Sequence, residues 1–151
     1  MKKKIALLAM IAVVMSTTIF ATPIDVTVSS NVLGTFSEKF TAAKEVSWST
    51  TDTYIKASFK MNDQYMFAYF TEEGQLIGVA RNLVSTQLPF NLQVELRKAS
   101  ENGWITELFE FANESETSYF VTIENADQKI QLKSTGYNTW TTYKKIKKSR
   151  S

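Results

Sequence analysis

The chain has 151 residues, with 17 Lys or Arg, 15 Asp or Glu, and neither cysteine nor histidine. Without Cys and His it cannot form disulfides, Ser-His-Asp or Cys-His catalytic groups, or zinc sites built on these ligands. We therefore expect no metal, no cofactor and no enzymatic activity. A carboxylate-based hydrolase of the cell envelope is the catalytic alternative, because the acids remain available.

Residues 1–21 have the features of a secretory signal peptide. Lys2, Lys3 and Lys4 give a positive start, an apolar run follows, and a stretch rich in small residues ends at Ala21. The run is too short to span a membrane comfortably, although an uncleaved anchor is the alternative. We expect cleavage after Ala21, a periplasmic or secreted protein, and no membrane span in the mature chain.

Removing this segment changes the charge of the protein. The whole chain has a formal net charge of +2, but three of its basic residues lie in the signal. The mature balance is 14 basic minus 15 acidic residues, or −1. This charge gives no reason to expect a nucleic-acid partner.

The first expected helix follows the mature N-terminus. Leu33, Phe36 and Phe40 recur at the spacing of one helical face. Ser30 is the candidate N-cap, and residues 35–38 form a rival capping box that would start the helix later.

A second helix is expected after Pro89, which a first helical turn tolerates. Leu92, Leu96 and Ala99 mark its apolar face, and Gly103 is a plausible C-terminal stop.

Apolar alternation predicts two sets of antiparallel strands, one after each helix. Turn-forming residues at 71–74 and 125–127 close a hairpin in each set. The expected strands are 46–49, 54–61, 64–70 and 75–81, then 104–112, 118–124, 128–133 and 139–146. The fold class is therefore α+β, with each sheet burying one face under its helix.

The two sets also align with each other. Asp63-Gln64 recurs as Asp127-Gln128, an offset of 64 that keeps the apolar alternation in phase and places Gly74 on Asn138. We interpret this as a tandem repeat with units at 22–86 and 87–151, the second ending in a basic tail. The alternative is that any two β-meanders share a period of two.

Residues 40–48, FTAAKEVSW, resemble the F-P-x-A-x-x-V-x-W signature of the PepSY-like, or β-lactamase-inhibitor-like, family. Residues 54–59, 73–76 and 88–89 are similar to its next strand, its turn and the start of its second unit. The resemblance covers residues 30–146, with Thr41 in place of the usual proline. It implies a small exported bacterial protein made of two helix-plus-antiparallel-sheet units, and it supplies no catalytic residues.

The strand at 64–70 is unusual because both of its faces are apolar. By the repeat, Met66, Ala68 and Phe70 face the helix. The opposite face carries Tyr65, Phe67 and Tyr69, joined by Tyr54 from the preceding strand. The counterparts of its three strand residues in the second unit are Lys129, Gln131 and Lys133, so that unit is expected to have a polar outer face.

We interpret Tyr54, Tyr65, Phe67 and Tyr69 as a face that binds another protein or peptide, with inhibitor-like binding as one form of this role. Alternatives are an internal surface covered by the rest of the chain, a site for a flat ligand such as a carbohydrate, or a purely structural envelope protein. The basic tail at residues 144–150 is either a solvated end or a weak contact with an anionic surface.

Overall fold

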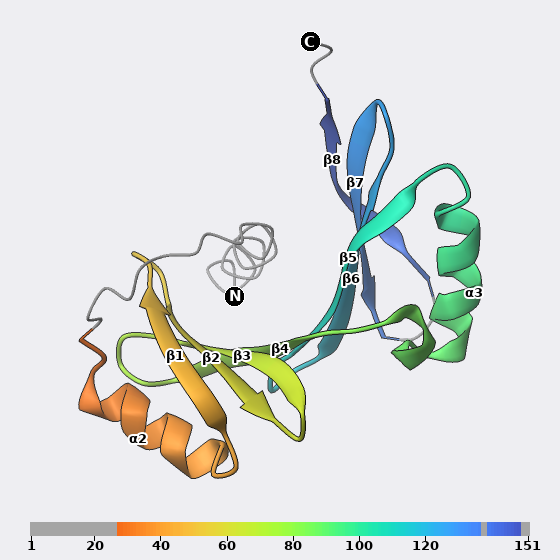
Figure 1. Cartoon of the computed structure of the whole chain (residues 1–151). Coiled ribbons are helices and arrows are strands. Elements are labelled where there is room, and N and C mark those ends of the chain that lie inside the picture. Colours follow the sequence, from red (N-terminus) through yellow and green to blue (C-terminus); the bar gives the residue numbers. More distant parts are fainter. Residues whose placement is uncertain (1–26, 137–138, 149–151) are drawn as a thin grey trace. The chain divides into compact units, whose positions relative to one another are not determined.

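The computed structural model describes residues 27–136 and 139–148 (Figure 1). The expected signal peptide, its cleavage after Ala21, Asn138 of the repeat alignment and Arg150 of the tail lie outside the described residues. In the ranges that are described, no helix is long and apolar enough to cross a membrane.

The fold is α+β, as predicted, and its strands follow one another in chain order in an antiparallel sheet. The helices are α2 (Ser30–Lys39), α3 (Phe90–Ala99) and the short 3-10 helix η1 (Ser85–Gln87). The strands are β1 (Lys44–Thr50), β2 (Ile55–Met61), β3 (Gln64–Phe70), β4 (Leu76–Asn82), β5 (Trp104–Ala112), β6 (Thr117–Glu124), β7 (Gln128–Thr135) and β8 (Thr141–Lys147).

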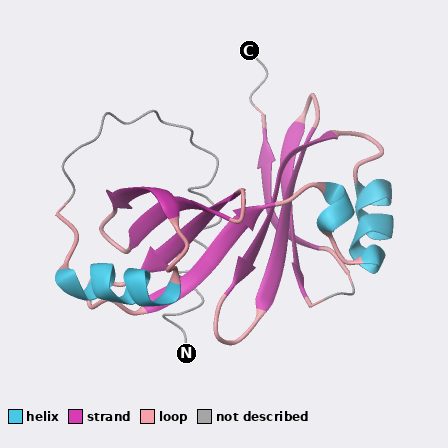
Figure 2. Cartoon of the chain, turned by 60° about the horizontal axis from the view of Figure 1, so that its bottom comes forward, coloured by secondary structure: helices cyan, strands magenta, loops and turns pink. Residues whose placement is uncertain are grey.

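The chain divides into two compact units, residues 1–77 and 78–151, at a point inside β4. In the first unit α2 lies along one side of β1–β3, and in the second α3 lies beside β5–β8 (Figure 2). Each unit therefore contains a helix and antiparallel strands. The boundary that we predicted from the repeat, at 86/87, lies further along the chain.

A two-residue turn sets the register of β2 and β3. Asn62 and Asp63 have φ angles of 51° and 61°, and a type I′ hairpin turn needs positive φ at both of its central residues. Met61 pairs with Gln64 beside the turn. Because directly opposite residues share a face, this turn fixes which side chains of both strands point toward α2.

Aromatic side chains hold α2 against the sheet of the first unit. The Phe36 ring centroid lies 5.1 Å from that of Phe59 and 6.4 Å from that of Phe70. Phe40 lies 4.9 Å from Phe59, and all four rings are buried. The prediction that Phe70 faces the helix is confirmed, and Phe59 lies on the same side.

The start and the buried face of α2 differ from the prediction by one residue. Ser29, not Ser30, is the N-cap, and its hydroxyl accepts a hydrogen bond from the Val32 N–H at 3.4 Å. Leu33 is 42% exposed, whereas Val32 is fully buried. The buried face runs through Val32, Phe36 and Phe40 at four-residue steps, so Leu33 points to one side of it.

Leucine side chains of α3 form the core of the second unit. Leu92 and Leu96 are buried, and Trp140 donates its indole N–H to the Leu92 carbonyl at 3.1 Å. The core cluster contains Leu83, Leu88, Leu92, Leu96, Leu108, Tyr119, Val121 and Ile123, with Leu132 and Trp140 packed against it.

The C-terminal end of α3 differs from the prediction. The helix ends at Ala99, which is exposed, and the Ser100 hydroxyl donates to the Leu96 carbonyl at 2.9 Å. Gly103 lies beyond this end. A Cβ atom at Gly103 would lie 2.8 Å from the Glu124 carbonyl oxygen, so this glycine permits a close backbone approach.

Phe70→Ala tests the packing beneath α2. We expect a loss of about 3–5 kcal/mol in the free energy of unfolding, because a fully buried ring is replaced by a cavity. Phe90→Ala is the matched control, since Phe90 is 75% exposed and its loss should cost under about 0.5 kcal/mol. Urea unfolding of both variants measures the difference, and similar costs would contradict this account of the core.

Candidate binding face of the first unit

We call the side of β2 and β3 that points away from α2 the outer face of the first unit. Its directly opposite cross-strand pairs are Lys56–Tyr69, Ser58–Phe67 and Lys60–Tyr65. The three aromatic residues of β3 thus share one face, as predicted, because strand alternation separates them from Phe70. Lys56 and Lys60 of β2 lie directly opposite Tyr69 and Tyr65 and bring positive charge to this aromatic surface.

The four predicted face residues differ sharply in exposure. Tyr65 is 59% exposed and Phe67 is partly buried. Tyr54 and Tyr69 are each 2% exposed, and their rings meet edge to face with centroids 5.3 Å apart. Tyr54 and Tyr69 therefore fit the alternative of a covered surface and Tyr65 does not, while the assignment of the four residues to a binding face stays a prediction. Strand alternation assigns a side chain to a face, but coverage of that face depends on contacts distant in sequence.

Burial also keeps the two inner phenols protonated. It raises the pKa of Tyr69 far above the ordinary tyrosine value, and the neighbouring Tyr54 adds to the rise. Burial raises the pKa of Tyr54 as well. A tyrosine is already neutral at physiological pH, and burial makes ionisation of these two still less favourable. They can pack and donate hydrogen bonds, but they cannot serve as phenolate bases.

At the exposed end of the outer face, Lys60 and Glu45 have partners within the unit. The Lys60 ammonium lies 5.9 Å from the centroid of the Tyr65 ring and 3.7 Å from an oxygen of Asp63. The Tyr65 hydroxyl donates to Glu45 Oε2 at 3.4 Å. The Asp63 side chain is 99% exposed, so its ion pair contributes little stability.

Lys56 occupies the middle of the outer face. Its ammonium lies 5.7 Å from the centroid of the Phe67 ring, and burial lowers its pKa. Among the described residues, no carboxylate lies within ion-pair distance of it. The outer face therefore carries one partly buried cation that has no counter-ion in this part of the chain.

The outer face of the second unit carries polar residues, as predicted, but buried aromatic rings lie among them. Gln131 and Lys133 do lie on it, yet Phe109, Phe111 and Phe120 share the same side and are at most 2% exposed. Phe109 and Phe120 stack with ring centroids 5.0 Å apart. The prediction was incomplete because it considered β7 alone, whereas β5 and β6 supply these rings.

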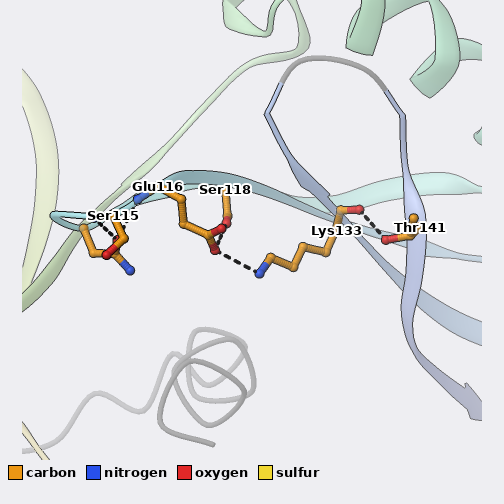
Figure 3. Close-up of polar contacts among 6 residues, drawn as sticks. Ser115, Glu116, Ser118, Lys133 and Thr141 are labelled. Atoms are coloured by element: carbon orange, nitrogen blue, oxygen red, sulfur yellow. Dashed lines mark hydrogen bonds and ion pairs between the residues drawn. The ribbon is translucent and has the colours of Figure 1, made fainter. Parts of the chain in front are cut away.

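Lys133 in the second unit is paired, unlike Lys56. Its ammonium lies 5.6 Å from the Phe120 ring centroid. It also lies 3.4 Å from Glu116 Oε1 (Figure 3). The same carboxylate oxygen accepts a hydrogen bond from the Ser118 hydroxyl at 3.1 Å. Thr141 donates to the Lys133 carbonyl at 3.0 Å, which links β8 to this site. A lysine over a ring is here neutralised within the unit.

Two carboxyl groups have pKa values shifted away from those of an acid catalyst. A hydrogen bond from Lys148 lowers the pKa of Glu124, and one from Thr71 lowers that of Glu73. The acid of a glycosidase needs the opposite shift. Across residues 27–136 and 139–148, no three Asp or Glu side chains are grouped as a metal site requires.

No protein-family model and no curated protein matches the chain. Among solved structures, a DUF2874 family protein from Bacteroides ovatus ATCC 8483 matches with a TM-score of 0.71 and 21% identity, over 81% of this chain and 89% of that one. A BLIP-like protein from Bacteroides fragilis NCTC 9343 matches with a TM-score of 0.67 and 14% identity, over 83% and 90%.

The fold is β-lactamase-inhibitor-like. A third match, provisionally named a periplasmic protein, comes from Bacteroides eggerthii DSM 20697, with a TM-score of 0.70, 16% identity and coverage of 81% and 90%. The family resemblance predicted from residues 40–48 is thus confirmed at the level of a β-lactamase-inhibitor-like fold, and its PepSY-like part stays a prediction. At these identities, the likeness concerns the fold and not a shared activity.

The same substitution at two positions of β3 tests the division of the outer face. Tyr69→Lys should cost about 3 kcal/mol or more, because it places a charge where a buried ring now packs. Tyr65→Lys should cost under about 1 kcal/mol, because Tyr65 is 59% exposed. Urea unfolding compares the two variants with the unsubstituted chain. Equal losses in the free energy of unfolding would contradict the conclusion that Tyr69 is buried while Tyr65 is exposed.

Proposed function

We propose that this chain is a non-catalytic, exported binding module that holds another protein or peptide through the outer face of its first unit. One observation carries the proposal. Tyr65 is 59% exposed on a sheet face that also carries the partly buried Phe67, and the uncompensated Lys56 lies over the Phe67 ring. The contact surface is centred on Tyr65 and Phe67, with Tyr54 and Tyr69 as buried support beneath it.

Tyrosine suits such a role for a physical reason. Its ring offers a large, rigid apolar surface with few torsions to immobilise, and its hydroxyl can bond to a partner or to water. The Tyr65 hydroxyl already donates to Glu45, which orients the ring in the free protein. A ring held in place before binding loses less conformational entropy in the complex.

The other parts of the proposal have separate support. Export to the periplasm or the medium is supported by the charged and apolar residues 1–21 and by the provisional periplasmic name of one solved neighbour. A PepSY-like tandem organisation is supported by the 64-residue offset in the sequence. Inhibitor-like binding is supported by the BLIP-like neighbour only through its fold.

Affinity capture with matched baits tests the proposed function. The exported chain, a Tyr65→Ala, Phe67→Ala double variant, and Phe90→Ala are each used to capture proteins from an envelope extract of the producing cell. We expect a protein that the first and third baits retain and that the double variant binds about tenfold more weakly or less. Phe90 is the control because its exposed ring lies in the second unit.

A partner retained equally by all three baits would place binding elsewhere on the chain and contradict the proposed face. The far-UV spectrum and urea midpoint of each bait show whether it is folded. This separates loss of the binding surface from loss of structure.

A further inference from the structure

Four lysines in the described part of the chain lie over aromatic rings, and one of them differs from the rest. The distances from ammonium to ring centroid are 5.7 Å for Lys56 and Phe67, 5.9 Å for Lys60 and Tyr65, 5.6 Å for Lys133 and Phe120, and 5.5 Å for Lys148 and Trp104. Three of these lysines pair with a carboxylate, namely Asp63 at 3.7 Å, Glu116 at 3.4 Å and Glu124 at 2.7 Å. For Lys56, the described residues offer no such group.

The surroundings of Lys56 do not compensate its charge. On β1 the residue opposite Lys56 is Ser49, and on β3 it is Tyr69, so neither neighbouring strand places a charge beside it. Lys56 is partly buried, and burial lowers its pKa. A partly desolvated ammonium without a counter-ion is unfavourable, and an incoming carboxylate would relieve that cost.

We propose that the outer face of the first unit binds an acidic peptide segment, with one Asp or Glu carboxylate of the partner on the Lys56 ammonium and a neighbouring apolar side chain on Tyr65 and Phe67. This inference rests on the proposed function and names the chemistry of the partner. The carboxylate supplies the missing counter-ion, and the Phe67 ring beneath the ammonium holds the lysine in position for it.

The charges around the face favour a single carboxylate over a polyanion. Glu45 and Asp63 lie at the end of the face near Tyr65, where they would repel a run of phosphates. Lys44 and Lys60 are directly opposite each other on β1 and β2, but Lys60 is already paired. Lys44 is exposed, so Lys56 is the partly buried cation of this face without an ion pair among the described residues. One such cation, with acids at one end of the face, fits one carboxylate flanked by apolar residues.

Selection with a library of random short peptides tests this inference. The library is displayed on phage and selected against the exported chain. We expect the selected peptides to carry Asp or Glu next to an aromatic or aliphatic residue. The best binder is then synthesised as a fluorescent peptide, together with a twin in which its acid is replaced by the corresponding amide.

Binding of both peptides is measured to three proteins. The twin should bind the unsubstituted chain about tenfold more weakly than the acidic peptide does. Lys56→Met should weaken the acidic peptide by the same factor and leave the twin unchanged, so that the double-mutant cycle shows direct coupling. Lys147→Met, which removes an exposed lysine of β8, is the charge-matched control and should bind like the unsubstituted chain.

Three results would overturn the inference. The first is a selection that enriches no acids, and the second is equal binding of the acidic peptide and its twin. The third concerns the slope of the logarithm of the binding constant against the logarithm of the salt concentration. A slope much steeper than about one ion pair would give indicates a polyanion site. In any of these cases, an envelope protein that binds the unsubstituted chain but not the Tyr65→Ala, Phe67→Ala double variant would still support the proposed function. Only the inference of an acidic peptide partner would then be rejected. Urea midpoints of Lys56→Met and Lys147→Met verify that both variants fold.

Discussion

The pairing register of β2 with β3 determines what each face of the first unit contacts. Side chains alternate along a strand, so a slip of one residue would move Phe70 from beneath α2 to the outer face and Tyr69 into its place. The turn at Asn62 and Asp63 prevents this slip, because two consecutive residues with positive φ suit a two-residue hairpin loop. The core under α2 and the lysine-aromatic outer face therefore arise from the same turn.

Part of this arrangement can be predicted from the sequence, because it depends on short-range periodicity. Alternation in β2 and β3 places Phe59 and Phe70 toward α2 and Tyr65 away from it, and the structure agrees. Helical spacing is less decisive, since three-residue and four-residue steps both fit one face. It predicted that Leu33 is buried, whereas Val32 is the buried residue. The exposure of Tyr69 could not be predicted, because no local pattern encodes what covers a face.

The offset of 64 aligns the strand pairing of the two units, although the residue types at the aligned positions differ. It carries the pair Lys56–Tyr69 of β2 and β3 onto the pair Phe120–Lys133 of β6 and β7. It also carries Ala57–Ala68 onto Val121–Leu132. The register is thus shared, which favours the predicted repeat, while lysine and ring have exchanged strands. Comparison of β3 with β7 alone revealed the lysine in the second unit and missed the ring opposite it.

The two units also differ in whether a partly buried cation has a carboxylate partner. In the second unit, Arg81 donates Nε to Glu110 Oε1 at 3.0 Å and Nη2 to Oε2 at 3.1 Å. These hydrogen bonds raise the pKa of Arg81 and keep it charged. Lys133 has Glu116 in the same role.

Lys56 has no such partner among the described residues, although an apolar side chain of similar length would cover Phe67 without any desolvation cost. In the isolated chain, contact with the Phe67 ring offsets only part of the cost of this charge. A chain that receives a carboxylate there gains both a counter-ion and selectivity against uncharged partners, because an uncharged partner would leave the ammonium desolvated and unpaired.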